Sequence, residues 1–179
     1  TAGEYPVTEL VSLAAQSNAQ VQAVPLRSDL EGIGVNSRLD LAVVEGAMQE
    51  RLRTHWILNG VGFEDPPSIS IDSEVKIEAD VTIRSNTQLR GKTSVGSGTV
   101  VGPNANLTDV SVQENCIIGA STLDGVTIEA NVKIGPYCHL RENTYLSLSS
   151  RIGSHVETKN THIGANSTVA HFCYLGDAI

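Results

Sequence analysis

An aliphatic residue recurs about every six residues through the C-terminal two-thirds of this chain, from about Ile69 to Ile179. Eighteen of the nineteen successive positions counted from Ile71 to Leu175 are Ile, Leu or Val, with steps of five in places, and the one exception is Thr158. The residue four places after each aliphatic is mostly small or β-branched. A period of six is neither 3.6 nor 2, so neither an amphipathic helix nor a hairpin sheet fits the pattern.

A six-residue unit is long enough for one short strand and one corner, and three such units close a triangular coil. Each coil then points its aliphatic residues inward, where they stack on those of the coils above and below. The pattern predicts a left-handed parallel β-helix over residues 67–179. About six coils at a spacing of roughly 4.8 Å give a prism on the order of 29 Å long.

The N-terminal third has no six-residue period, and its patterns indicate helices and one strand. Polar residues that favour helix capping and Gly or Pro that end helices give the boundaries. We expect a helix over 6–18 with Leu10, Val11, Leu13 and Ala14 inward, followed by a strand over 21–26 and a loop over 32–34. A second helix should run from Ser37 to about Leu58, with Ser37 or Asn36 as its N-cap and Asn59-Gly60 ending it. Pro66-Pro67 should form the hinge into the repeat region.

Composition excludes several classes of partner. The formal net charge is −8, which argues against binding to nucleic acid or to an anionic membrane surface. No apolar run approaches the roughly 20 residues that span a bilayer.

The three cysteines, Cys116, Cys138 and Cys173, are an odd number without metal-ligand spacing, so we expect reduced core residues in a cytoplasmic protein. Residue 1 is not Met and the repeat stops in mid-pattern, so both ends look cut.

An ordered set of motifs resembles one family. The set comprises Gly3-Glu4-Tyr5 with Thr8, Gly34-Val35-Asn36-Ser37-Arg38, Asp65-Pro66, Ile134-Gly135-Pro136-Tyr137, Leu140-Arg141, Val156-Glu157-Thr158-Lys159 and His171-Phe172-Cys173-Tyr174-Leu175-Gly176-Asp177-Ala178. Together these motifs resemble the bifunctional bacterial enzymes that make UDP-N-acetylglucosamine. The resemblance implies the C-terminal α/β end of a Rossmann-like uridylyltransferase domain over 1–36, a helical linker over 37–66 and an acetyltransferase β-helix over 67–179.

Two cations are spaced by one full coil. Arg141 and Lys159 are eighteen residues apart, and each follows a repeat position. Their side chains should therefore stack outward from adjacent coils at roughly 4.8 Å, where a phosphate between them would relieve their repulsion. The alternative is that Glu142 and Glu157 neutralise them as surface pairs. In the family that the chain resembles, the matching positions bind the sugar phosphate.

His171 lies in a segment that resembles the family's His-x-x-Tyr-Leu-Gly-Asp-Ala pattern, in which the histidine is the general base. An amine that attacks a thioester must lose a proton, and imidazole titrates near neutral pH. Tyr174 matches a sugar-binding position. Without the motif, His171 would be interpreted as a structural histidine and Tyr174 as a corner-packing residue.

Asn36 matches a family position that helps to hold Mg²⁺ and the nucleotide sugar, although an Asn before a helix is by itself an N-cap. Glu4, Tyr5 and Thr8 match a stretch that lines the sugar pocket. The sequence departs from the family pattern at Pro6 and Glu9, at Ser37 and at Glu142-Asn143.

The resemblance implies a transferase with two reactions. Acetyl passes from acetyl-CoA to glucosamine-1-phosphate, and the product then reacts with UTP and Mg²⁺. It also implies a homotrimer and a cytoplasmic location. A Gly-rich UTP loop and the coils that hold most of the acetyl-CoA site are missing from these 179 residues, so we expect the chain alone to be inactive in both reactions.

Three other interpretations compete with this one. A γ-type carbonic anhydrase shares the fold, but His139, His155, His162 and His171 lack its ligand spacing. A non-catalytic scaffold or ice-binding module would need outward Thr ladders, whereas Thr87, Thr93 and Thr99 fall at the inward small position. A sugar-nucleotide pyrophosphorylase with a non-catalytic β-helical tail remains, and the His171 segment argues against it.

Overall fold

The computed structural model describes residues 6–26 and 28–178, which divide between Val44 and Glu45 into two compact units. The N-terminal unit holds α1 (Val7–Gln16), the 3₁₀ turn η1 (Asp29–Gly32) and the start of α2 (Arg38–Leu58). The predicted helix over 6–18 is confirmed. Its predicted inward face is not, because Leu10, Val11 and Leu13 are 55–61% exposed within this unit.

The strand predicted over 21–26 is wrong. Residues 19–26 have no regular structure, and the described part of this unit contains no strand. A lone extended segment has no backbone partners, so alternating side chains are not enough to make a strand. Glu4 and Tyr5, two of the residues that the resemblance placed in a sugar pocket, lie outside the described residues.

Helix α2 begins and ends as the sequence predicts. Ser37 is the N-cap, because its hydroxyl accepts the Asp40 N–H at 3.1 Å and the Asp40 carboxylate accepts the Ser37 N–H at 2.8 Å. At the other end Gly60 takes φ +89°, and the Val61 N–H reaches the Trp56 carbonyl at 3.1 Å. This pairing closes the helix with a left-handed Gly cap.

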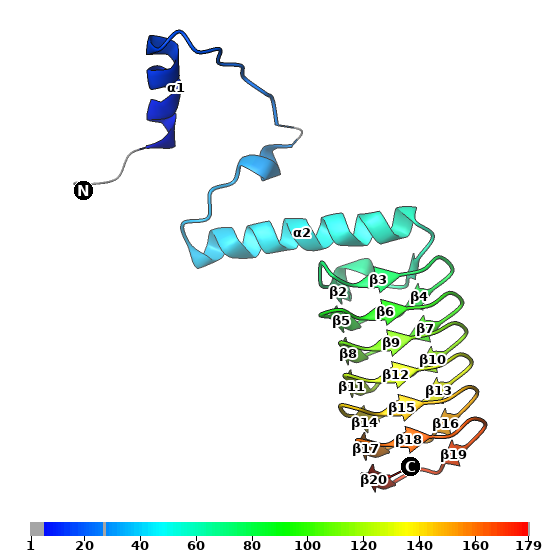
Figure 1. Cartoon of the computed structure of the whole chain (residues 1–179). Coiled ribbons are helices and arrows are strands. Elements are labelled where there is room, and N and C mark those ends of the chain that lie inside the picture. The colour runs from blue at the N-terminus through cyan, green and yellow to red at the C-terminus, as the bar shows by residue number, and fades with distance from the viewer. Residues whose placement is uncertain (1–5, 27, 179) are drawn as a thin grey trace. The chain divides into compact units, whose positions relative to one another are not determined.

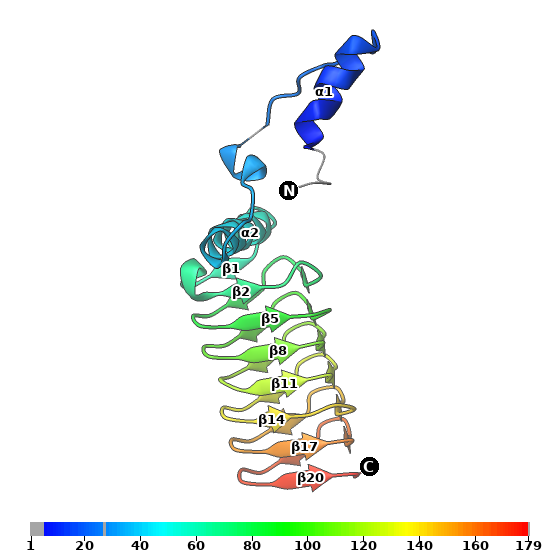
Figure 2. The ribbon, with the colours of Figure 1, turned by 90° about the vertical axis from the view of Figure 1, so that its left-hand side faces the viewer.

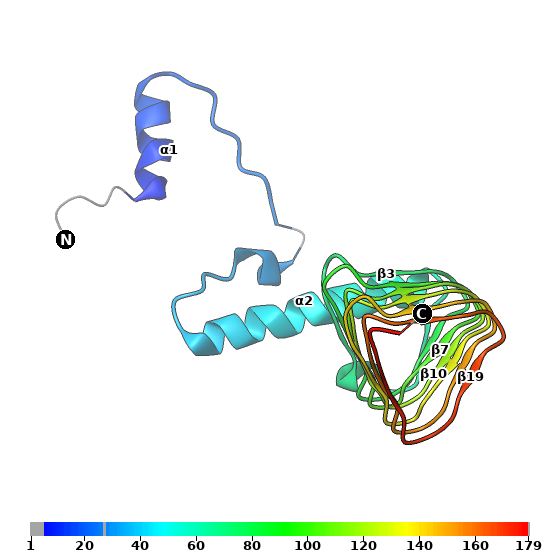
Figure 3. The same cartoon turned by 60° about the horizontal axis from the view of Figure 1, so that its bottom comes forward.

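The C-terminal unit is a left-handed parallel β-helix of about seven turns, which is triangular in cross-section (Figure 1 and Figure 3). Each side of the triangle is one parallel sheet, here called face A, B or C. Face A contains β1 (Gly62–Phe63), β4 (Thr82–Ile83), β7 (Val100–Val101), β10 (Ile117–Ile118), β13 (Lys133–Ile134), β16 (Arg151–Ile152) and β19 (Thr168–Val169).

Face B is turned toward the viewer in Figure 2. It contains β2 (Ser70–Ile71), β5 (Gln88–Arg90), β8 (Asn106–Thr108), β11 (Thr122–Asp124), β14 (His139–Leu140), β17 (Glu157–Lys159) and β20 (Tyr174–Gly176). Face C contains β3 (Lys76–Ile77), β6 (Ser94–Val95), β9 (Ser111–Val112), β12 (Thr127–Ile128), β15 (Tyr145–Leu146) and β18 (His162–Ile163).

The number of turns exceeds the predicted six because β1 precedes the first repeat position. β1 pairs in parallel with β4, and the 3₁₀ turn η2 (Pro66–Ser68) connects it to β2. Phe63 occupies its inward position and packs against the core. The counted series began at Ile71, so the sequence pattern did not reveal this additional strand.

The core is the stack of repeat side chains. The positions from Ile71 to Ile163 are at most 8% exposed, and Val169 and Leu175 of the last described turn are partly buried. Thr87, Thr93 and Thr99 are 0% exposed, which confirms that they face inward and leaves no outward ladder at these positions. Cys116 and Cys138 are buried and free, and burial raises the pKa of both thiols.

Most corners of the coil contain a residue with left-handed backbone. Asn, Asp and Gly fill most of these positions, as their low cost in this region predicts. Three aromatic residues are exceptions, and all three lie at the corner between faces A and B: Tyr137 (φ 63°), His155 (φ 57°) and Phe172 (φ 56°).

The C-terminal half of α2 covers the first turn of the β-helix. The Gln49 amide donates to the Ile71 carbonyl and accepts the Ile71 N–H, both at 2.9 Å. Arg53 donates to the Ile69 carbonyl at 3.1 Å. These side chains take the place of a neighbouring strand, so the edge strand β2 is not left as an open template.

No helix in the described residues is both long and apolar enough to cross a membrane.

The one polar repeat position has a buried partner. Thr158 is 0% exposed, and its hydroxyl lies 2.9 Å from that of Thr144, which is 1% exposed. We expect Thr158→Val to lower the free energy of unfolding by about 1–2 kcal/mol, because it leaves the Thr144 hydroxyl unpaired in the core. Replacing both residues by Val should restore most of the loss. Urea denaturation of the two single variants and the double variant measures the coupling, and additive losses would contradict it.

Candidate functional site

Arg141 and Lys159 stand one above the other on face B. The strand register pairs Leu140 with Thr158, and the Arg141 N–H donates to the Thr158 carbonyl at 2.9 Å, so the two cations follow adjacent core positions in neighbouring coils. The register therefore places the two residues in adjacent coils, as the eighteen-residue spacing predicts. Lys159 is exposed and makes no ion pair with a described residue.

The alternative interpretation of Arg141 holds in part. Its guanidinium lies 3.3 Å from the Glu157 carboxylate, with 36% and 42% of the two side chains exposed. A half-exposed pair of this kind contributes at most about 1 kcal/mol. Glu157 precedes Lys159 on β17 and is nearer the A–B corner, so this contact turns Arg141 toward that corner.

Tyr174 lies on the same face, one strand further on. β20 pairs with β17 so that Tyr174 aligns with Glu157 and Gly176 with Lys159. The tyrosine ring lies along its own strand, since a Cβ on Gly176 would be only 2.5 Å from the tyrosine hydroxyl oxygen. Tyr174 is 62% exposed. Face B therefore carries Lys159 on β17 and Tyr174 on β20, and Arg141 directly follows β14, the strand before them.

His171 lies at the corner between faces A and B, three residues before Tyr174 and at the opposite end of β20 from Gly176. Its backbone packs closely on the preceding coil: a Cβ on Gly153 would approach the His171 nitrogen to 2.9 Å. The His171 side chain is exposed. Among the described residues, no hydrogen bond or ion pair that we observe joins it to Arg141, Lys159 or Tyr174.

A groove on face A also reaches His171. It has a volume of about 470 Å³, and Lys133 and Arg151 line it together with His171. These two cations stack in register on β13 and β16, and neither pairs with a described carboxylate. Sequence reasoning missed them, although they show the same signal as Arg141 and Lys159: two cations eighteen residues apart, each beside a repeat aliphatic.

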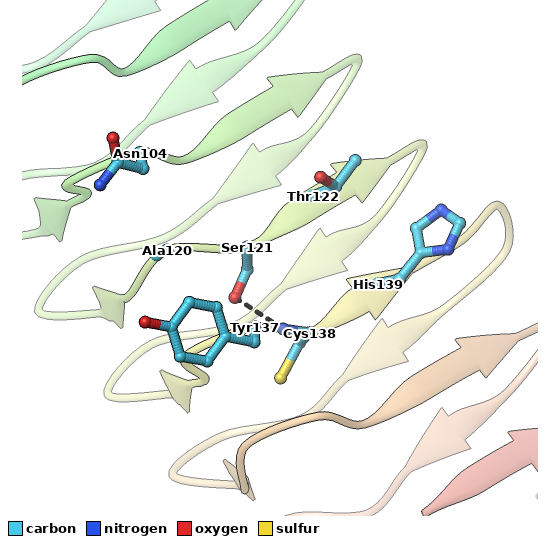
Figure 4. Close-up of a pocket in the computed structure, with 7 residues that line it drawn as sticks. All are labelled: Asn104, Ala120, Ser121, Thr122, Tyr137, Cys138 and His139. Carbon is cyan, nitrogen blue, oxygen red and sulfur yellow. Dashed lines mark hydrogen bonds between the residues drawn. The ribbon is translucent and has the colours of Figure 1, made fainter. Parts of the chain in front are cut away.

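A second hollow of about 520 Å³ lies along the same corner, in earlier coils than His171 (Figure 4). The step from Ile118 to Leu123 is one residue short, so the corner at Ala120 is set back between those at Asn104 and Tyr137. Ser121 and Cys138 are buried here, and the Ser121 hydroxyl accepts the Cys138 N–H at 3.1 Å. This hollow is not part of the predicted site.

The remaining histidines lie on different parts of the coil. His139 is on face B, 3.9 Å from Asp124. His162 is on face C, where its ring nitrogen lies 2.9 Å from the Ser147 hydroxyl. The described residues contain no group of three His, Cys, Asp or Glu placed to bind a metal, so a three-histidine zinc centre finds no support in them.

Asn36 belongs to the N-terminal unit. Its backbone N–H donates to the Asp40 carboxylate at 3.1 Å. Hydrogen bonds from the Ser37 hydroxyl and from the backbone N–H of Asn36 lower the pKa of Asp40. The Asp40 carboxylate already accepts hydrogen bonds in the helix cap, so it is not available as a metal ligand. This leaves the side-chain amide oxygen of Asn36 as the one candidate ligand of the pair. The described residues do not by themselves fit a magnesium site, which needs several oxygen ligands.

Fold and site together define a class: this is a hexapeptide-repeat β-helix with a pair of stacked cations on each of two faces and a histidine at the corner between them. A solved structure of the N-acyltransferase AntD of Bacillus cereus, a point mutant in complex with dTDP and coenzyme A, has a similar fold. Its TM-score is 0.58 at 15% identity, over 68% of this chain and 83% of that one. No protein-family model matches the chain.

Comparison with curated protein sequences gives a more specific likeness than comparison of folds. The chain is 42% identical over 176 residues to the bifunctional protein GlmU of Streptococcus pyogenes serotype M1 and 39% identical over 175 residues to that of Synechococcus elongatus. Both alignments cover 98% of this chain. The resemblance predicted from the sequence is thereby confirmed. The chain spans 38% of the length of these relatives.

The stacked cations make a testable anion site. We expect Lys159→Ala to raise the dissociation constant for inorganic phosphate about tenfold, because one charge-assisted contact is lost. Lys133→Ala is the matched control, since it removes a lysine from face A and should leave this face-B site unchanged. Phosphate titrations followed by NMR of the face-B amides measure both variants. Equal losses in the two would indicate non-specific attraction.

Proposed function

We propose that this chain is the acetyltransferase β-helix of a bifunctional enzyme of UDP-N-acetylglucosamine synthesis. In this reaction acetyl passes from acetyl-CoA to the amine of glucosamine-1-phosphate. One observation carries the proposal: Arg141 and Lys159 stack in register on face B, and the next strand of that face carries Tyr174 and begins at the His171 corner. The relation to GlmU supports the same assignment.

Arg141 and Lys159 bind the phosphate of the sugar. Two exposed cations about one coil apart repel by about 1 kcal/mol in water, and a phosphate between them reverses the sign. The guanidinium offers a two-pronged contact and the ammonium a point charge. Glu157 competes for Arg141 only through a half-exposed pair, which a phosphate bound by both cations can displace.

Tyr174 supplies a surface for the sugar ring. Its ring lies flat along β20 and is mostly exposed. An aromatic face packs against the C–H groups of a pyranose, and the phenol hydroxyl can exchange hydrogen bonds with a sugar hydroxyl. The ring also covers the strand segment beside Lys159, so the sugar and its phosphate are held side by side.

His171 acts as the general base. The sugar amine attacks the thioester carbonyl carbon and passes a proton to the imidazole. The tetrahedral intermediate then expels the coenzyme thiolate, which takes up that proton as the C–S bond breaks. The amine and the phosphate are on adjacent carbons of the sugar. His171 and the two cations must therefore lie no further apart than one sugar ring allows.

The resemblance supplies further parts of the proposal. The complete enzyme forms a homotrimer in the cytoplasm, in which a neighbouring copy closes the site. It also couples the acetylated sugar phosphate to UTP in a second reaction that requires Mg²⁺. From this chain Asn36 would contribute one oxygen ligand or a contact to the nucleotide sugar.

The decisive variant is His171→Ala in the complete gene product. We expect the kcat of acetyl transfer to fall by about 10²–10⁴, the usual contribution of a general base, with uridylyl transfer unchanged. His162→Ala is the matched control, because this histidine lies on face C and should leave both activities intact. Separate assays of free thiol release and pyrophosphate release report the two reactions. If acetyl transfer by His171→Ala stayed within tenfold of wild type, the base would be misassigned and a non-catalytic tail would be favoured.

A further inference from the structure

Four rings are in contact along the A–B corner, and they end at His171. The centroids of Tyr137 and His155 are 5.1 Å apart, and His155 stacks on Phe172 at 4.7 Å with an interplanar angle of 17°. Phe172 then meets the His171 imidazole edge-on at 5.8 Å. The rings come from three successive coils, so this contact chain links the body of the β-helix to the proposed base.

The backbone at these corners is unfavourable for aromatic residues. Tyr137, His155 and Phe172 all have φ between 56° and 63°, where an ordinary side chain costs roughly 1 kcal/mol relative to Gly. The two earlier described corners of this column with left-handed residues, at Asn86 and Asn104, use asparagine, which tolerates this region better than most residues other than glycine. Aromatic residues replace it only in the coils that lead to His171.

The backbone hydrogen bond of the corner does not require the rings. Each corner residue donates its backbone N–H to the preceding coil: Tyr137 to the Ala120 carbonyl, His155 to the Pro136 carbonyl and Phe172 to the Ser154 carbonyl. Asn104 makes the same contact to Ser85, so the bond is independent of the side chain. The side chains of Tyr137 and Phe172 are 64% and 75% exposed, so they bury little apolar surface. Backbone strain that repeats beside a candidate catalytic group indicates a functional constraint.

We propose that His155 is a positioning residue for His171. It acts through Phe172: the stacked imidazole of His155 fixes the Phe172 ring, and the edge of that ring restricts the rotamers of the His171 side chain. This inference rests on the proposed role of His171 as general base. His155 touches neither substrate nor reacting atoms. Its contribution is the orientation of the base, where a displacement of about 1 Å can cost up to 10²-fold in rate.

Two substitutions at one position separate positioning from stability. His155→Asn removes the ring and leaves the residue type that the other corners use, so the melting temperature should stay the same or rise. His155→Phe keeps a stacking ring without the imidazole nitrogens. In the complete gene product we expect His155→Asn to lower the kcat of acetyl transfer about tenfold with the KM for glucosamine-1-phosphate within twofold, and His155→Phe to restore kcat to within threefold of wild type.

Tyr137→Asn is the matched control. It removes a ring from the same corner but one coil further from His171, without touching Phe172, and should change kcat by no more than twofold. NMR of the His171 ring resonances gives a readout independent of activity: we expect them to broaden or shift in His155→Asn and to match wild type in His155→Phe.

The outcomes distinguish the two proposals when His171→Ala is assayed in parallel. If His171→Ala is inactive while His155→Asn keeps wild-type kcat and His171 resonances, the positioning role is wrong and the general base stands. If His171→Ala retains activity, the general base is wrong and the positioning role is overturned with it. A loss of activity in His155→Asn that His155→Phe does not restore would also overturn positioning by the ring.

Discussion

The in-register stacking of one buried side chain per strand is the constraint on which the rest of this structure depends. Leu123, Leu140 and Thr158 follow one another at the same depth on face B, and the equivalent rows run through the other two faces. Side chains alternate along a strand, so each neighbour of a buried residue points outward at the same height in every coil. Outward columns are therefore a consequence of the inward rows.

This rule makes the basic columns inseparable from the core. Arg141 and Lys159 align because Leu140 and Thr158 do, and Lys133 and Arg151 align because Ile134 and Ile152 do. A slip of one residue in either row would turn cations inward and aliphatics outward, at a cost that no surface interaction could offset. The fold thus sets the separation of the charges without any direct contact between them.

Those parts of the molecule that depend on the repeat could be predicted from the sequence. The β-helix, the inward Thr87 and the stacking of Arg141 on Lys159 all follow from counting in sixes. The ends of helix α2 could be predicted equally well, because Ser37 and Gly60 are residue types that cap helix termini. These predictions succeeded because each depends on contacts that are local in the chain or repeat at a fixed interval.

The errors arose where the period does not apply. The segment 21–26 alternates like a strand, but alternation only says which side chains share a face, and pairing needs a neighbour that the pattern cannot supply. β1 was missed because Phe63 precedes the regular series. The ring contacts of His155 depend on corner residues, which the count of aliphatic positions passes over, although a bulky residue where Asn or Gly is usual was a visible signal.

The strongly negative net charge and the basic columns are compatible because of distance. A charge of −8 repels an anionic substrate from afar, yet at physiological ionic strength that repulsion fades beyond about 8 Å. Within that range the local charges decide. Face B carries Arg141 and Lys159, face A carries Lys133 and Arg151, and the corner between these faces carries His171. An anion that contacts either pair of cations therefore meets a local excess of positive charge, even with Glu157 beside Arg141. The acidic remainder of the surface disfavours polyanions, whose charges extend well past one screening length.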